Sequence, residues 1–248
     1  MNTYHGVTGP PELDPIPGAG FRLSQRYLRI DAQQGFRALD LHQVDGMVLA
    51  LDWVVGNAHH IWGSAVLVAP GVALTARHVV DEMRAKGFLG GEGGHLLAFG
   101  FHPDGMAIWN PRSFTTIGDG DLAMLTLTRV TAGPGVVAQH PISLNVAVMA
   151  ARQPSVGEIV SLVGYAASEM RFDMADWQAA GVSLLGGVGP ITDLYSDGRD
   201  LSLPNPAIAV CARTVGGMSG GGAFDEHGRL IGVPFTIDTQ LLTGVLSS

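Results

Sequence analysis

Residues 63–78 read GSAVLVAPGVALTARH, two short apolar runs with a Pro-Gly turn between them and a histidine at the end. Short apolar runs bounded by Gly and Pro are typical of β-strands. Proline fixes φ and glycine tolerates a positive φ, so Pro70-Gly71 predicts a tight turn. The stretch therefore predicts two successive strands, with His78 at the end of the second, facing a cleft.

Runs of the same kind continue along the chain in two groups. The first group covers 47–51, 64–68, 72–76, 95–101 and 121–128, and the second covers 158–164, 181–185, 207–212, 222–224 and 230–236. Only 79–86 and 167–180 are suitable for short helices. Two groups of short strands that flank one linker predict an all-β protein built from paired barrels.

The first 45 residues differ from the rest of the chain. They contain several prolines and no sustained period, which predicts an extended arm with one short strand or helix. Packing against the body is favoured over a regulatory or docking role for this arm. The predicted organisation is an N-terminal extension (1–45), a first barrel (46–130), a linker (131–154) and a second barrel (155–248).

The acidic composition limits the partners that the chain can bind. Lys and Arg number 14 against 22 Asp and Glu, a net charge of −8. An acidic surface repels phosphate backbones, and no run of Lys or Arg offsets this, so we expect no nucleic-acid partner. No apolar stretch approaches the ~20 residues that span a bilayer, so we expect no membrane partner.

Cysteine content and the N-terminus bear on location. Cys211 is the only cysteine, so no intramolecular disulfide can form, which fits a reducing compartment. Residues 1–20 are polar and rich in Pro and Gly, without the basic start and apolar block of a secretory signal. We therefore expect a cytoplasmic protein.

Two further segments carry reactive side chains. Residues 120–125 read GDLAML at the start of a predicted strand, and residues 216–224 read GGMSGGGAF. A hydroxyl is a poor nucleophile at neutral pH, so Ser219 would need a base to remove its proton. The glycines around it allow a sharp turn, so that the amides of Gly217 and Ser219 can point at one spot and stabilise an oxyanion.

Together with residues 63–78, these segments resemble the three signature segments of the trypsin/chymotrypsin-like serine peptidase family, in the family's order of His, Asp and Ser. The resemblance covers roughly residues 46–236. It implies two packed six-stranded antiparallel β-barrels. It also implies a triad in which His78 is the general base, Asp121 orients it and Ser219 is the nucleophile.

The acid has a rival two residues away. Asp119 precedes Asp121 but lacks the Asp-Leu-Ala-x-Leu context that matches the family pattern. The chain separations also agree with that pattern, since 43 residues separate His78 from Asp121 and 98 separate Asp121 from Ser219. These intervals leave room for the strands of each barrel.

The resemblance implies a serine endopeptidase that cleaves protein or peptide substrates through an acyl-enzyme, with no cofactor and no metal. A regulatory protein partner is left open. By the same resemblance, the pocket for the side chain before the cleaved bond is lined by Arg213, Thr214, Val215, Pro234, Phe235 and Thr236. None of these is acidic, which disfavours a preference for Arg or Lys, whereas Arg213 could attract an acidic side chain.

Two positions depart from the family pattern. Met218 stands where animal digestive members carry an Asp that pairs with a new N-terminal amine. Methionine cannot form that ion pair, so we expect no activation by burial of a fresh N-terminus. Pro234 stands where many relatives have a small hydroxyl residue, and we expect its carbonyl to accept a substrate amide hydrogen.

Two other functions are compatible with part of the sequence. An idle or latent relative could serve as a protein-binding module, although an intact triad has no use there. An esterase would have a G-x-S-x-G elbow, which residues 217–221 satisfy, but that fold orders its triad Ser, acid, His on a parallel sheet. A metal site is disfavoured at His59 and His60, because adjacent side chains on a strand face opposite ways.

Overall fold

The computed structural model describes residues 24–27, 46–56, 58–87, 94–102, 105–130, 146–171, 181–200, 204–237 and 240–245. These residues form two sheets and one helix, α1 (Arg77–Ala85). The first sheet contains β2 (Val48–Val55), β3 (Ala58–Ala69), β4 (Val72–Thr75), β5 (His95–His102), β6 (Gly105–Thr116), β7 (Ala123–Arg129) and β9 (Ser168–Arg171). The second contains β1 (Ser24–Tyr27), β8 (Ile159–Tyr165), β10 (Gly181–Tyr195), β11 (Ala207–Val210), β12 (Gly222–Phe224), β13 (Leu230–Ile237) and β14 (Gln240–Val245).

The first sheet closes into a barrel of six antiparallel strands. Its strand order is β2-β5-β6-β7-β4-β3, and β3 pairs back onto β2. Closure pairs each of these six strands with two neighbours, although within the barrel Ala58–Ile61 of β3 pairs only with β2. Alternate residues of the strands fill the interior, where Leu49, Leu51, Leu67 and Leu125 are buried.

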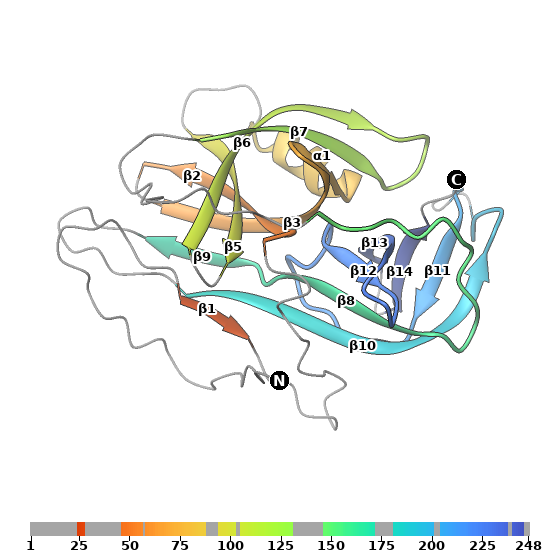
Figure 1. The fold of residues 1–248 in the computed structure, drawn as a ribbon. Helices are drawn as coiled ribbons and strands as arrows, with labels where there is room; N and C mark the ends of the chain where they lie inside the picture. The colour runs from red at the N-terminus through yellow and green to blue at the C-terminus, as the bar shows by residue number, and fades with distance from the viewer. Residues whose placement is uncertain are drawn as a thin grey trace.

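The second sheet curls round beside the first, as Figure 1 shows. Its order is β10-β11-β14-β13-β12-β8, and β8 pairs back onto β10. The long strand β10 makes this possible because its first part pairs with β8 and its last part, from Ile191, pairs with β11. The predicted fold of two six-stranded antiparallel barrels is confirmed.

Several strands were not predicted at their observed length. Strands β6 and β14 had no counterpart among the predicted strands, and β10 extends ten residues beyond the predicted 181–185. The extension contains glycines that local rules treat as breaks. Gly189 has a packing reason instead, since a Cβ there would lie 1.8 Å from the carbonyl oxygen of Cys211, whose amide bonds the neighbouring Pro190 carbonyl at 2.9 Å.

Each sheet also has a seventh strand. The helix suggested at 167–180 is wrong for its described part, because Ser168–Arg171 is the strand β9, antiparallel to Ala58–Ile61 of β3 (Figure 1). Pairing with the open edge of β3 overrides local preference, and residues 172–180 lie outside the described residues. In the arm, the short element is the strand β1, parallel to β10, and the rest of 1–45 lies outside the described residues.

Helix α1 lies between β4 and β5 of the first barrel, and the linker joins the two barrels. Helix α1 coincides with the helix expected at 79–86 and buries Val79, Val80 and Met83. In the linker, the Ala147 amide donates to Leu67 of the first barrel at 2.7 Å, and the Ala150 amide donates to Leu230 of the second at 2.9 Å. Residues 131–145 of the linker lie outside the described residues. Within the described part of the chain, no helix has the length and apolar character to cross a membrane.

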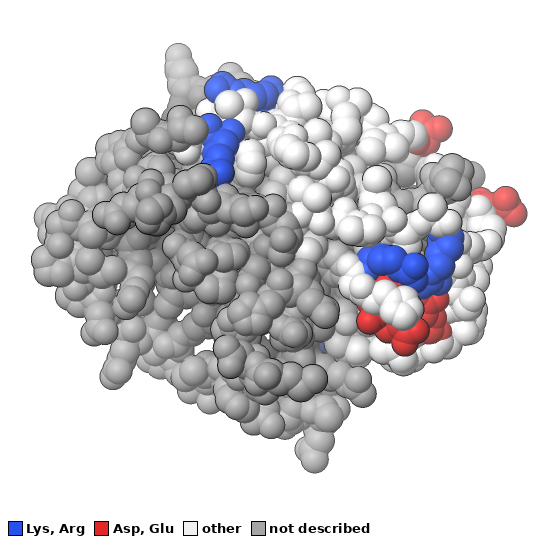
Figure 2. Space-filling model, in the orientation of Figure 1, with Lys and Arg blue, Asp and Glu red and all other residues white. Residues whose placement is uncertain are grey.

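An ion-pair cluster fixes the β12–β13 hairpin to the linker. The buried carboxylate of Asp225 accepts hydrogen bonds from Arg229 at 2.8 Å and from Arg152 at 3.0 Å, and Arg152 also bonds Glu158. Figure 2 shows basic and acidic groups side by side on a face whose other described atoms are mostly uncharged. These donors, together with the amides of His227 and Arg229, lower the pKa of Asp225 to about 2 against the opposing effect of its burial.

Candidate active site

His78 lies in the first turn of α1, directly after β4. The carboxylate of Asp121 accepts two hydrogen bonds from it, one from the backbone amide at 2.7 Å and one involving ring Nδ1 at 2.6 Å. The amide of Arg77 donates to the Asp121 carbonyl at 3.2 Å. One aspartate therefore fixes both the start of the helix and the orientation of the imidazole.

Asp121 ends the turn between β6 and β7. Its rival Asp119 is exposed in the same turn, and no hydrogen bond joins it to His78 among the described residues. The turn rests on Asn205, since a Cβ at Gly120 would lie 2.6 Å from the Asn205 Nδ2. That nitrogen is buried without a hydrogen-bond partner in the described part of the chain. Sequence reasoning did not single out Asn205, because a lone Asn in a loop carries no signal.

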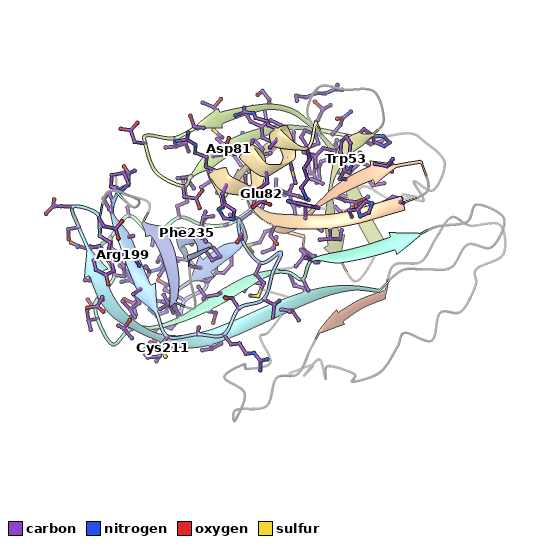
Figure 3. The ribbon with its side chains drawn as sticks, turned by 180° about the vertical axis from the view of Figure 1, so that it is seen from behind. Trp53, Asp81, Glu82, Arg199, Cys211 and Phe235 are labelled. Carbon is purple, nitrogen blue, oxygen red and sulfur yellow. The ribbon has the colours of Figure 1, made fainter. Side chains whose placement is uncertain are left out.

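The charge of His78 is set by opposing effects. Burial lowers its pKa, but the hydrogen bond to Asp121 and the charges of Asp121, Glu82 and Asp81 outweigh burial and raise the pKa above its ordinary 6.5. Asp81 and Glu82 both project from α1 (Figure 3). Glu82 is held in place because it accepts a hydrogen bond from the Trp62 indole at 3.0 Å. These acidic neighbours therefore stabilise the protonated form of His78 more than water would.

Ser219 lies in a tight loop, residues 216–221, here termed the nucleophile loop. Gly217 and Gly220 have φ of 91° and 88°, a region in which only glycine is unstrained. Both positions are also filled by neighbours, since a Cβ at Gly217 would lie 2.2 Å from the Ala167 nitrogen and one at Gly220 would lie 2.1 Å from the Ser64 oxygen. The glycine-rich sequence is therefore required by conformation and by space.

The loop brings Ser219 close to the start of α1. A Cβ at Gly63 would lie 2.6 Å from Val79 Cγ1 and 3.5 Å from the Ser219 carbonyl oxygen. Val79 and Ser219 therefore both lie next to Gly63. Ser219 is partly exposed. Among the described residues, no hydrogen bond joins its hydroxyl to His78. The geometry thus links His78 directly to Asp121 and places the Ser219 backbone near Val79, the residue that follows His78.

The residues expected to line the specificity pocket lie in different environments. Arg213 is exposed, Thr214 and Val215 are partly buried, and Phe235 is 3% exposed within the core (Figure 3). The Thr236 side chain lies outside what the structure describes. The carbonyl of Pro234, expected to accept a substrate amide hydrogen, accepts the Gly220 amide at 2.9 Å and so helps to hold the nucleophile loop.

Met218 is also an internal residue. It is 1% exposed and packs with the core of the second barrel, and a Cβ at Gly164 would lie 2.7 Å from its Cα. An aspartate at this position would need a buried cationic partner. The methionine instead anchors the loop by apolar packing.

Comparison with known proteins agrees with this architecture. A family model for the trypsin-like peptidase domain matches residues 63–233. None of the curated proteins compared with the sequence matches it. Many solved structures are similar in fold, among them Deg5, the MamO protease domain and Rv3671c. Deg5 has a TM-score of 0.56 and 18% identity, over 82% of this chain and 86% of that chain.

The other two are protease structures of comparable likeness. The MamO protease domain from Magnetospirillum magneticum has a TM-score of 0.55 and 18% identity, over 82% of this chain and 94% of that chain. An inactive form of Rv3671c from M. tuberculosis H37Rv has a TM-score of 0.51 and 16% identity, over 83% and 84%. At such identities the likeness supports the fold, while the family model spans more than half of the sequence. The chain belongs to the trypsin-like peptidase family.

Proposed function

We propose that this protein is a serine endopeptidase that hydrolyses peptide bonds through an acyl-enzyme, with His78, Asp121 and Ser219 as its triad. The observation that carries the proposal is the pair of hydrogen bonds that the Asp121 carboxylate accepts from His78, one from the backbone amide at 2.7 Å and one from ring Nδ1 at 2.6 Å. A carboxylate only accepts hydrogen bonds, so Nδ1 carries a proton. In the neutral imidazole Nε2 then has the free lone pair of a base.

The chemistry then follows in two halves. The Ser219 hydroxyl adds to the scissile carbonyl while Nε2 of His78 takes its proton, and His78 returns that proton to the departing amine. Water repeats the sequence on the acyl-enzyme and releases Ser219. The acidic groups that raise the pKa of His78 stabilise the imidazolium that forms in each half.

The oxyanion would be held by the amides of Gly217 and Ser219. Within a peptide plane the N–H points opposite to the C=O. The Gly216 carbonyl accepts the Ala167 amide at 2.7 Å, and the Met218 carbonyl accepts the Gly221 amide at 3.1 Å. These two bonds orient the amides of Gly217 and Ser219, which share peptide planes with the two carbonyls. In the described part of the chain neither amide has an acceptor. This arrangement supports a preorganised oxyanion site.

The proposed substrate is a protein or peptide chain. Figure 2 offers no continuous basic surface on the described part of its face, which supports the exclusion of nucleic acid. The segment 213–215 contains no acid that would attract Arg or Lys, whereas Arg213 is exposed beside the loop. We therefore propose an uncharged or acidic side chain before the cleaved bond.

One observation favours a second candidate, a latent or idle domain that binds protein. The Ser219 hydroxyl has no hydrogen bond to His78 among the described residues, and a resting triad needs that bond to form before reaction. Catalytic hydrogen bonds in empty sites are often long and tighten on substrate binding, so the endopeptidase is preferred.

The first experiment is digestion of a diverse peptide library by the wild-type protein beside Ser219→Ala. We expect cuts that disappear in the variant, and covalent labelling of the wild type alone by a fluorophosphonate. The residue before each cut tests the role of Arg213 directly. Labelling without cleavage would favour the latent form, and neither labelling nor cleavage would reject the endopeptidase.

A further inference from the structure

We propose that Ser64 is a positioning residue that holds the nucleophile loop in its oxyanion-binding form, an inference that rests on the proposed function. Ser64 lies on β3 of the first barrel, far in sequence from the loop, and is 0% exposed. Its sequence context is that of an ordinary residue in an apolar strand. Its contacts distinguish it.

Every polar group of Ser64 is engaged at the junction of the barrels. Its hydroxyl bonds the Gly217 carbonyl at 2.8 Å and the Tyr165 amide at 2.7 Å. Its amide donates to the Ser219 carbonyl at 2.9 Å. Its carbonyl accepts the hydroxyl of Thr75 at 2.6 Å. One residue of the first barrel therefore bonds the loop at two points.

The direction of these bonds is fixed by chemistry. The Tyr165 amide can only donate, so it occupies a lone pair of the Ser64 hydroxyl and leaves the hydroxyl hydrogen for the Gly217 carbonyl. The Gly217 carbonyl belongs to the peptide that joins residues 217 and 218. The amides that would bind the oxyanion belong to the peptides on either side of it, those of Gly217 and Ser219. Gly217 has glycine's wide conformational freedom, and the bond from Ser64 removes it.

The same residues connect Ser64 to the base. Thr75, which holds the Ser64 carbonyl, lies three residues before His78. Gly220 lies against both, since a Cβ there would be 2.1 Å from the Ser64 oxygen and 2.2 Å from the Thr75 hydroxyl. The segment that positions His78 thus also positions the loop, so Ser64 aligns the nucleophile and its amides with the base from the opposite barrel.

The test compares Ser64→Ala with the wild type on the best-cleaved peptide. We expect kcat to fall by about 10-fold to 100-fold, less than the ~100-fold to 1,000-fold lost with a whole oxyanion donor, because the amides stay but lose their alignment. KM should change less than about threefold, since the ground-state substrate does not need the oxyanion site. A trifluoromethyl ketone made from the same peptide, whose adduct carries an oxyanion, should bind more weakly by the same factor as kcat falls.

Val66→Ala provides the matched control. Val66 is a fully buried neighbour on β3 and bonds no part of the loop, so its truncation lowers stability without touching the alignment. We expect this variant to keep its kcat at temperatures where it is folded. If Ser64→Ala does not fold, Thr75→Val removes the bond to the Ser64 carbonyl with little change of volume and should give the same division between kcat and KM.

The outcomes separate the two proposals. Normal cleavage by both the wild type and Ser64→Ala would overturn the role of Ser64 alone. Losses in Ser64→Ala and Val66→Ala that follow their melting temperatures would also overturn it. A wild type that neither cleaves nor takes up the fluorophosphonate would overturn the endopeptidase, and the role of Ser64 with it. A crystal structure of Ser64→Ala gives a readout without turnover, in which we expect the Gly217 carbonyl to have moved and an unmoved loop would contradict us.

Discussion

Replacement of Asp225 by Asn should destabilise the protein by an amount that depends on pH. The folded structure lowers the pKa of this buried carboxyl from 3.8 to about 2. At about 1.4 kcal/mol per unit of pKa, the ionised form contributes about 2 kcal/mol to the free energy of unfolding at neutral pH. Asparagine keeps the shape but not the charge, so Arg152 and Arg229 lose their common partner.

The sign follows from the direction of the shift. Because the folded-state pKa is lowered, the contribution is complete well above 3.8 and is lost as the pH falls toward about 2. At pH 3 about half of this contribution should already be lost, so the difference in unfolding free energy between wild type and Asp225→Asn should narrow from about 2 to about 1 kcal/mol.

Urea unfolding at pH 7 and pH 3, followed by fluorescence, measures both gaps. Asp197→Asn is the control, because Asp197 is exposed and the same chemical change there should have little effect at either pH. A gap of the same size at both pH values would refute the electrostatic reasoning. A gap below about 0.5 kcal/mol at pH 7 would show that the cluster is balanced by its desolvation cost.

Three further predictions concern the site. The value of kcat/KM should rise with pH around a pKa above 6.5, the ordinary value for histidine, because His78 must be neutral to act as the base. Glu82→Gln should move this rise to lower pH. A rise at unchanged pH would show that Glu82 does not affect the pKa of His78. Asp121→Asn should lower kcat by about 10⁴-fold while Asp119→Asn leaves it within about twofold, and equal effects would contradict the assignment of the acid. Gly220→Ala adds a methyl 2.1 Å from a backbone oxygen of β3 at a φ of 88°, so it should abolish activity and lower the melting temperature, and a variant of normal activity would show that the loop can move.

The sequence predicts best what short segments determine. Strand β4 and the turn at Pro70-Gly71 follow from a short apolar run and turn chemistry and lie where expected, and β3 contains the predicted 64–68 but begins at Ala58. The contact between His78 and Asp121 was implied by the family pattern, and the two side chains are indeed bonded. These features depend on local sequence or on motifs spread over a few residues.

Features that arise from contacts between distant segments were not predicted. Residues 168–171 form a strand because the edge of β3 is open to them, which nothing in their own sequence indicates. The hydroxyl of Ser64 and the amide of Asn205 act through neighbours that are more than 80 residues away in the chain. The bond from the Gly220 amide to the Pro234 carbonyl was not predicted, because a pattern of residue types does not say which oxygens the fold itself uses.

Strand β9 follows β8 of the second sheet in the chain but pairs with β3 of the first sheet, and this has a consequence for folding. Ile61 pairs with Ser168, more than 100 residues later in the chain, so the edge of β3 stays unpaired during synthesis until the strand after β8 has been made. An exposed strand edge is a template for misassembly with other chains. Pairings of such long sequence separation also slow folding, because the loop must close before the contacts stabilise it. We therefore expect the newly made first barrel to be most prone to misassembly before β9 pairs with it.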